Sequence, residues 1–431
     1  MKYYSTNNKN EKVSFRSAIL KGLADDKGLF MPERIPGLDS NFLKSLEKFN
    51  FQEIALKIAE VFVEDEISSG KLEEIISNSI SFNAPLKKLS DQLFVLELFH
   101  GPTLAFKDFG ARFMARTMEH FAQNENRDIN ILVATSGDTG SAVANGFLEV
   151  EGINVVVLFP KDKISKMQEK QITTLGKNIT ALEINGTFDD CQKLVKTAFV
   201  DNELKTRLRL SSANSINIGR LIPQSFYYFE SYKQLILNEK IVYSVPSGNL
   251  GNLTAGLIAK KMGLPINKFI AATNSNNVFT EYIDSGIFNP RESVITFSNA
   301  MDVGDPSNLV RINDLYNNDH SLIADVIYSK SYSDPETLTK INSIKEVFDY
   351  TIDPHGAVGC LALDDYKNAT DENIIGVVLE TAHPSKFIDV YKDNLNFEPS
   401  IPDRLAENLK KEGHAIKLSK EYDDLKELLL N

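Results

Sequence analysis

The stretch "IVYSVPSGNLGNLTAGLIAKKMG", residues 241–263, decides the fold class. It begins with an apolar, β-branched run, passes through a loop that contains Gly248 and Gly251, and continues in a pattern typical of a helix. Gly263 stands where that helix is expected to end, because glycine readily adopts the conformation that closes a helix. A buried strand, a glycine-bearing loop and a helix in succession predict a unit of an α/β fold.

The same alternation of strand and helix extends over most of the chain. Several of the apolar runs lack polar alternation, which is typical of strands buried on both faces of a parallel sheet. Strands are expected at 93–99, 129–135, 153–160, 178–184, 241–247, 268–274 and 373–380, and helices at 107–122, 138–150, 164–175, 187–206, 217–238 and 252–262. The pattern predicts a doubly wound α/β protein.

The two ends of the chain do not show this alternation of strand and helix patterns. Residues 1–80 hold helical patterns at 14–24 and 41–63 and few convincing strands, which favours a separate N-terminal helical domain. The tail from residue 398 onward is charged and is expected to be helical.

Composition excludes several classes of function. The 431 residues carry a net charge of −12, which argues against binding to nucleic acid or to an anionic membrane. Cys191 and Cys360 lie far apart and the six histidines do not cluster, so neither a disulfide framework nor a metal site is expected. The polar start "MKYYSTNNKNEK" does not resemble a secretory signal, and no apolar run reaches the roughly 18 residues of a membrane helix. A cytoplasmic protein is expected.

The glycine-bearing loop in "VPSGNLGNLTAG" (245–256) is a candidate phosphate site. Free N–H groups and the positive end of the helix dipole at the start of a helix suit a phosphate. The loop matches neither the Walker A motif nor G-x-G-x-x-G. On its own, a purely structural turn explains it equally well.

A second loop, in "ATSGDTGSAVA" (134–144), also follows a strand and precedes a helix. Its small hydroxyls and its helix N–H groups suit a carboxylate or a phosphate, and helix capping by Asp138 or Thr139 is the structural alternative. Its candidate binding residues are Thr135, Ser136, Asp138 and Thr139.

Lys107 stands among aromatic residues in "HGPTLAFKDFGARF" (100–113). The structural alternative is that its stem packs on Phe106 while its ammonium group reaches Asp108 or solvent. An amine held in an apolar pocket would instead have a lowered pKa and would attack an aldehyde. An amine of this kind together with a phosphate loop fits pyridoxal phosphate. Thr381, at the end of the last strand, could reach a ring placed between the loops, or could merely end that strand.

These segments together resemble the threonine synthase family, whose members use pyridoxal phosphate and have the tryptophan-synthase-β-like fold. "QEKQITTLG" (168–176), "SSANSINIGR" (211–220), "SNAMDVGDPSN" (298–308), "TAHPSKF" (381–387) and the N-terminal region add to a resemblance that covers nearly the whole chain. It implies fold type II, with two open, twisted, mostly parallel sheets flanked by helices and a mainly helical N-terminal domain. The implied domains are 1–84, a two-lobed cofactor-binding core at 85–397 with the smaller lobe at roughly 125–215, and a helical extension at 398–431.

The resemblance also assigns residues. It implies that Lys107 forms the Schiff base with the cofactor and that Thr381 faces the pyridine nitrogen. Relatives often have Phe and Asp in place of Leu250 and Asn252, and contacts made by backbone N–H groups would survive both changes. The implied phosphate-binding loop consists of Gly248, Asn249, Leu250, Gly251 and Asn252.

The implied reaction converts O-phospho-L-homoserine and water to L-threonine and phosphate. The loop with Thr135, Ser136, Asp138 and Thr139 is expected to hold the substrate. Weaker candidates for the substrate phosphate are Lys163, Lys166, Ser215, Asn217 and Arg220. A monomer or a simple homo-oligomer is expected.

Three alternatives remain open. A serine/threonine dehydratase or a β-replacing enzyme would share the fold and the lysine. A catalytically silent binding protein could keep the same fold. A nucleotide-binding dehydrogenase is more distant, because G-x-G-x-x-G is missing.

Overall fold

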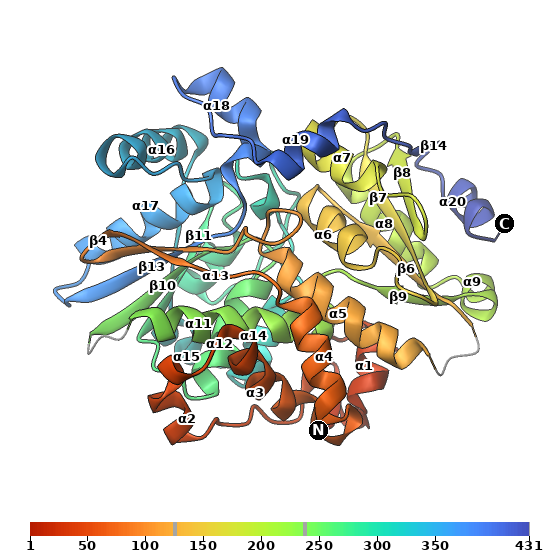
Figure 1. Cartoon of the computed structure of the whole chain (residues 1–431), viewed down its shortest axis with the longest axis horizontal. Coiled ribbons are helices and arrows are strands. Elements are labelled where there is room, and N and C mark those ends of the chain that lie inside the picture. The colour runs from red at the N-terminus through yellow and green to blue at the C-terminus, as the bar shows by residue number, and fades with distance from the viewer. Residues whose placement is uncertain (124–126, 236–238, 431) are drawn as a thin grey trace.

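Three β-sheets organise the fold, and Figure 1 shows strands of the two larger ones. The computed structural model of the protein describes residues 1–123, 127–235 and 239–430. The largest sheet has the strand order β12-β11-β10-β13-β5-β4. Its neighbours run parallel, except that β4 and β5 form an antiparallel edge. Its strands are β4 (Leu86–Ser90), β5 (Leu93–Glu97), β10 (Lys240–Pro246), β11 (Lys268–Thr273), β12 (Ile327–Ser331) and β13 (Ile374–Glu380).

The second sheet is entirely parallel, with the order β14-β8-β7-β6-β9. It consists of β6 (Ile129–Ala134), β7 (Ile153–Pro160), β8 (Ile179–Ile184), β9 (Arg209–Ser212) and β14 (Ile416–Leu418). All seven strands expected from the apolar runs are present in the two sheets, and β13 is buried along its whole length. The predicted α/β class with two mostly parallel sheets is therefore confirmed.

Helices flank both sheets (Figure 1), as the connections between parallel strands require. Helix α17, for example, packs against β10, β11 and β13. The helices of this region are α5 (Lys107–Ala122), α6 (Asp138–Gly146), α7 (Lys166–Thr173), α8 (Phe188–Ala198), α9 (Asn202–Arg207), α10 (Ile218–Leu221), α11 (Phe226–Leu235), α12 (Gly251–Lys261), α13 (Val278–Ser285), α14 (Leu309–Leu315), α15 (His320–Val326), α16 (Asp334–Phe348), α17 (Pro354–Asn368) and α18 (Ile388–Asn394).

Two helices expected to be continuous are broken. The stretch 187–206 forms α8, which ends at Ala198, and α9, which Asp201 caps by accepting from the N–H groups of Glu203 and Leu204. The stretch 217–238 begins with α10 and a 3₁₀ segment that contains Pro223, and it continues as α11. Proline lacks an N–H group and disrupts regular helix geometry. The last part of that prediction, residues 236–238, lies outside the described residues.

The N-terminal region contains more than helices. A small antiparallel sheet of β1 (Tyr3–Ser5), β2 (Asn8–Val13) and β3 (Phe30–Pro32) accompanies α1 (Phe15–Lys21), α2 (Ser40–Lys44), α3 (Phe51–Val63) and α4 (Ser69–Ser79). The region is mainly helical, as predicted. Its three strands were not recognised, because β1 and β3 are too short to show alternation and β2 is polar and almost entirely exposed.

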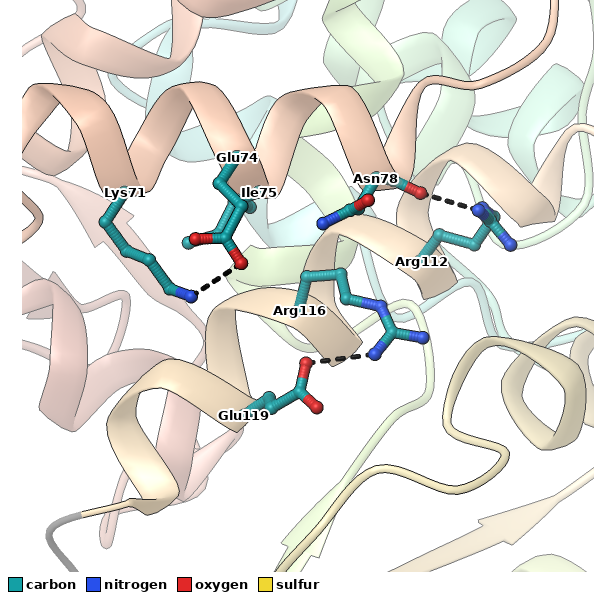
Figure 2. A pocket seen from close by; sticks show the side chains of 7 residues that line it. All are labelled: Lys71, Glu74, Ile75, Asn78, Arg112, Arg116 and Glu119. Carbon is teal, nitrogen blue, oxygen red and sulfur yellow. Dashed lines mark hydrogen bonds and ion pairs between the residues drawn. The ribbon is translucent and has the colours of Figure 1, made fainter.

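The N-terminal region is fixed to helix α5. The Arg112 guanidinium donates to the carbonyl oxygens of Asn78 (2.5 Å) and Ser79 (3.1 Å) at the end of α4, and Figure 2 shows the first of these contacts. Asn78 and Arg112 border a cavity of about 240 Å³ between α4 and α5. The ring of Phe109, on the same helix α5, packs 5.9 Å from Phe51 and 4.7 Å from Phe82. Phe109 therefore joins α5 to the N-terminal core.

The C-terminal tail also differs from the expected run of helices. Between α19 (Asp403–Lys410) and α20 (Tyr422–Leu430), strand β14 adds a parallel edge to the second sheet by pairing with β8. Its three residues are too few for a period-2 pattern to be recognised. Across the described parts of the chain, no helix combines the length and the apolar character that crossing a bilayer requires.

Candidate active site

A cavity of about 1850 Å³ lies at the carboxyl ends of β6, β10 and β13, where α/β proteins place their ligands. The residues that directly follow these strands, Thr135, Ser247 and Thr381, all line it. The three loops selected from the sequence therefore open onto one space. Of the predicted site residues, the lining includes Lys107, Thr135, Ser136, Thr139, Ser215, Arg220, Gly248, Asn249, Leu250, Gly251, Asn252 and Thr381.

Lys107 is the first residue of α5, and its side chain is 15% exposed. Its Nζ atom lies 5.0 Å from the ring centroid of Phe106 and 4.0 Å from Oδ2 of Asp138. Burial lowers the pKa of Lys107 to about 8; Asp138 opposes this effect, whereas Lys386 and Arg220 add to it. At pH 7 about a tenth of this amine is therefore unprotonated and nucleophilic, far more than for an ordinary lysine with a pKa near 10.4.

Asp108 does not serve as the partner of Lys107. Its carboxylate accepts from the N–H group of Thr103 (2.8 Å) and from the Thr103 hydroxyl (2.6 Å). A Cβ atom on Gly101 would lie 2.4 Å from Oδ2 of Asp108, so only glycine allows the turn to approach this carboxylate so closely. The alternative in which the ammonium group of Lys107 reaches Asp108 is therefore wrong.

The loop after β10 leaves backbone donors available at the start of α12. Helix α12 begins at Gly251 and has no side-chain N-cap hydrogen bond. The Asn252 amide oxygen accepts from the hydroxyls of Tyr227 (2.7 Å) and Tyr228 (2.8 Å), whereas its Nδ2 group is buried without a partner among the described residues. Uncapped helix N–H groups and an unpaired donor suit a phosphate, so the residues present fit the 5′-phosphate of pyridoxal phosphate.

The turn in this loop occurs at Leu250 rather than at either glycine. Leu250 has φ = 60° and ψ = 5°, the left-handed conformation, and its side chain is 2% exposed. Gly248 does not have a positive φ; a Cβ atom there would lie 2.8 Å from Cα of Met301. Gly248 is thus required for a close backbone contact and not for its conformation.

The loop after β6 is folded around the Thr135 hydroxyl. The Oγ1 atom of Thr135 accepts from the N–H groups of Gly137 (2.9 Å) and Gly140 (2.8 Å). Helix α6 has no side-chain N-cap hydrogen bond, so the expectation that Asp138 or Thr139 caps it was wrong. Ser136 and Thr139 line the cavity, and Thr139 carries a hydroxyl there at the start of α6.

Asp138 is engaged by other side chains instead. Its Oδ1 atom lies 2.5 Å from Nζ of Lys386 and accepts from Nε2 of Gln168 (3.0 Å), while its Oδ2 faces Lys107. Although burial opposes it, the charges of Lys386 and Lys107 hold the pKa of Asp138 well below its usual range. This carboxylate is ionised, and its position beside Lys107 is fixed.

Thr381 lies beside the lysine because two distant segments meet there. The N–H group of Phe106 donates to the Thr381 carbonyl oxygen (2.9 Å), and Ala105 forms an isolated bridge with Ala382. The Thr381 side chain is 6% exposed, and its hydroxyl makes no hydrogen bond to the described residues. That hydroxyl is free to interact with a ligand in the cavity.

The candidates for the substrate phosphate separate into two groups. Ser215 and Arg220 line the cavity; the Ser215 hydroxyl accepts from Nδ2 of Asn249 (2.6 Å), and Nε of Arg220 is buried without a partner in the described part of the chain. Lys163 and Lys166 are exposed and do not line the cavity.

Asn217 has a structural role. Its Nδ2 group donates to the carbonyl oxygens of Ile19 (2.9 Å) and Ser212 (3.1 Å), and its Oδ1 atom accepts from the N–H group of Gly219 (2.9 Å). The side chain is fully buried and caps α10. The structure thus contradicts the expectation that Asn217 holds the substrate phosphate.

Three groups near the cavity were missed in the sequence. Lys386 is fully buried beside Asp138. His355 lines the cavity and pairs through Nδ1 with Asp353 (2.7 Å). Arg311 is fully buried and donates to carbonyl oxygens of Phe30 and Ile216. Lys386 and Arg311 carry no local sequence signal, because each acquires its surroundings from segments distant in the chain. His355 has its partner Asp353 two residues away, but it meets Ala300 only through the fold. Among the described residues, no group of three or more His, Cys, Asp or Glu side chains is placed to hold a metal ion.

Comparisons with known proteins identify the family of the chain. Residues 2–80 match the family described as threonine synthase N terminus, residues 80–380 match pyridoxal-phosphate dependent enzyme, and residues 356–429 match threonine synthase, C-terminal. The threonine synthase of Haemophilus influenzae is 44% identical over 98% of this chain and 97% of its own. The crystal structure of threonine synthase from Escherichia coli superposes with a TM-score of 0.92 at 41% identity over the whole of both chains.

A third relative has its cofactor in place. The structure of PLP-bound threonine synthase from Brucella melitensis superposes with a TM-score of 0.93 at 33% identity and covers 100% of this chain and 99% of its own. The similarity thus extends over the N-terminal region, both parallel sheets and the C-terminal tail. The chain belongs to the threonine synthase family of pyridoxal-phosphate-dependent enzymes.

Proposed function

We propose that this enzyme converts O-phospho-L-homoserine and water to L-threonine and phosphate, with Lys107 as the residue that attaches the cofactor. The observation that carries the proposal is the position of Lys107. Its amine, whose pKa is lowered by burial, faces a cavity that also receives an uncapped helix N-terminus and the free hydroxyl of Thr381. The curated threonine synthases that are similar over the full chain support the same reaction.

When bound, pyridoxal phosphate supplies an aldehyde that bonds covalently to amines and a ring that withdraws electrons from the adjacent carbon. Lys107 then has two tasks. Its amine would attach the cofactor, and as a free amine it would take protons from Cα and Cβ of the substrate and return one to Cα. Loss of phosphate from Cγ, protonation of Cγ to a methyl group and addition of water at Cβ balance the atoms of the reaction.

The loop Gly248–Asn252 is proposed to hold the 5′-phosphate of the cofactor. The support is the uncapped start of α12 and the unpaired Nδ2 group of Asn252. Because the Asn252 amide oxygen is occupied by two tyrosine hydroxyls, its Nδ2 group remains available to donate to a phosphate oxygen. Thr381 is proposed to face the pyridine nitrogen with a neutral hydroxyl, which leaves that nitrogen less protonated than a carboxylate would.

The substrate is proposed to lie between Lys107 and the loop after β6. Ser136 and Thr139 offer hydroxyls to its carboxylate, and the Thr135 hydroxyl hydrogen remains available because Oγ1 is used as an acceptor. Asp138 acts on Lys107 rather than on the substrate, since its oxygens are already engaged. Arg220 and Ser215 are proposed to hold the substrate phosphate because they line the cavity, whereas Lys163 and Lys166 lie outside it.

The wider assignments remain predictions. We propose an N-terminal domain at 1–84, a two-lobed core at 85–397 with the smaller lobe at roughly 125–215, and an extension at 398–431. The small antiparallel sheet supports the first segment, and the five-stranded sheet supports the smaller lobe, although β14 reaches that sheet from the extension. A cytoplasmic location and a monomeric or simple homo-oligomeric state also stay predictions.

One assay tests the proposal. Phosphate and threonine formation from O-phospho-L-homoserine should be followed with and without added pyridoxal phosphate. Equal amounts of both products, dependent on the cofactor, are expected. Deamination of serine or threonine without phosphate release from the phosphorylated substrate would instead establish a dehydratase. A purified protein that stays colourless in the presence of the cofactor would establish a binding protein of the same fold.

A further inference from the structure

Lys386 is a lysine with no exposed side-chain surface, placed by the 3₁₀ segment Pro384–Phe387. Its Nζ atom lies 2.5 Å from Oδ1 of Asp138 and donates to the Thr103 carbonyl oxygen (3.0 Å). Burying an ammonium group is unfavourable unless it is paired and hydrogen-bonded, and both conditions are met here. The pair connects the turn before α5, the start of α6 and the segment after β13.

Asp138 lies between two lysines. One oxygen contacts Lys386, and the other lies 4.0 Å from Nζ of Lys107. The other charged groups that act on Lys107 are Arg220 on α10 and Asp353 at the start of α17, and Asp108 acts on Lys386 from α5. A single carboxylate therefore stands near two amines inside the protein, and its closer partner is not the lysine assigned to the cofactor.

We propose that Lys386 is a positioning residue that, by pairing with Asp138, prevents this carboxylate from becoming the counter-ion of Lys107. The proposal rests on the assignment of Lys107 as the cofactor-attaching amine. With Asp138 and Lys386 both charged, Lys386 offsets part of the stabilisation that Asp138 gives to protonated Lys107, so protonation of Lys107 adds an incompletely compensated positive charge to a buried site. The neutral amine is favoured as a result, and the neutral amine is the form that reacts with an aldehyde.

Neutralising Lys386 and neutralising Asp138 should shift the pKa of Lys107 in opposite directions. Removing the positive charge in Lys386→Met leaves Asp138 free to stabilise protonated Lys107, so the pKa of Lys107 rises. Removing the negative charge in Asp138→Asn leaves Lys386 as an unbalanced positive neighbour, so the pKa of Lys107 falls. A role limited to holding segments together would not reverse its sign between these two variants.

The test measures the rate at which the cofactor-depleted full-length protein captures pyridoxal phosphate as a function of pH. For the unaltered chain, the rate should rise with a midpoint near pH 8, which follows the neutral fraction of Lys107. Lys386→Met should move this midpoint upward by about one to two pH units, the size of shift that a nearby opposite charge produces. Lys340→Met is the matched control, because Lys340 pairs with Asp364 at 2.5 Å on α16 and α17 and does not line the cavity.

A double variant that removes both charges of the pair provides a second test in case a single substitution destabilises the fold. Lys386→Met combined with Asp138→Asn leaves no unpaired charge, so it should fold better than either single variant and should return the midpoint to within about half a unit of the unaltered chain. A midpoint unchanged in Lys386→Met, or displaced equally in the double variant, would overturn the proposal. Failure of the unaltered protein to form a visible cofactor band would instead refute the assignment of Lys107.

Discussion

A Cβ atom on Gly248 would lie 2.8 Å from the Cα atom of Met301 and 2.9 Å from the carbonyl oxygen of Ala300. The proposed phosphate loop is therefore supported from behind by the backbone of segment 298–308, and the two segments touch without a side chain between them. An added Cβ atom cannot be accommodated there by a change of side-chain rotamer, because the neighbouring atoms belong to the backbone.

Gly248→Ala should displace the loop and destabilise the protein by about 1–3 kcal/mol, the usual cost of overpacking. Gly251→Ala should cost less, because the nearest atom to its Cβ position is 3.5 Å away. The free energy of unfolding of the cofactor-depleted protein, measured with denaturant, compares the two. Equal costs for both variants would show that the contact with Met301 is not limiting.

At position 250 we expect a glycine variant to be more stable than an alanine variant, the reverse of the usual order within a helix. Its left-handed backbone costs a residue with a Cβ atom about 1–2 kcal/mol, and glycine is free of this cost. Leu250→Gly should therefore unfold with a free energy about 1 kcal/mol higher than Leu250→Ala. Leu257, buried within α12, provides the control, because there the alanine variant should be the more stable by about 1 kcal/mol. The same order at both positions would contradict the prediction.

Arg311 should not tolerate lysine. Its guanidinium donates to the carbonyl oxygens of Phe30 (3.0 Å) and Ile216 (2.7 Å) and so links the N-terminal sheet to the segment that lines the cavity. The single ammonium group of a lysine cannot make the several hydrogen bonds that the planar guanidinium makes. Arg311→Lys should therefore lower the unfolding free energy by about 3 kcal/mol. Denaturant unfolding at pH 7 measures the loss. A change below about 0.5 kcal/mol, the range of ordinary surface substitutions, would show that the link is dispensable.

His383 should make the folded protein sensitive to acid. Burial lowers the pKa of His383 to about 4, and the nearby His100 adds to the effect, whereas an unfolded histidine titrates near 6.5. Between these values the unfolded chain binds a proton that the folded chain does not, so stability falls as the pH drops from about 6.5 towards 4. His383→Gln should reduce this slope when unfolding free energies are compared at pH 7 and pH 5. A variant with an unchanged slope would assign the acid sensitivity to other groups.

The sequence predicted what depends on local pattern. All seven strands found as apolar runs are present, because strands buried on both faces leave a continuous signal. The strands β1, β2, β3, β4, β9, β12 and β14 were missed, because they are short or partly exposed and carry no such signal. Pro223 and Asp201 interrupt helices at positions where apolar periodicity alone continues.

The site was predicted in part. Lys107 could be found because its aromatic neighbours are also neighbours in sequence, and the loops after β6 and β10 because glycine and hydroxyl residues cluster there. Lys386 lies between Ser385 and Phe387, and nothing nearby indicates that it is buried against Asp138. Asn217 resembled a ligand in the sequence but proved to be a helix cap. Partners far apart in sequence decide such roles, and only the folded chain brings them together.

The most direct test of the central claim is to reduce the cofactor-loaded enzyme with borohydride and to map the modified peptide by mass spectrometry. If Lys107 attaches the cofactor, the added mass should lie on the peptide that contains Lys107, and Lys107→Ala should lose both this peptide modification and the visible absorbance. Modification of another lysine, or a reducible chromophore that persists in Lys107→Ala, would contradict the claim.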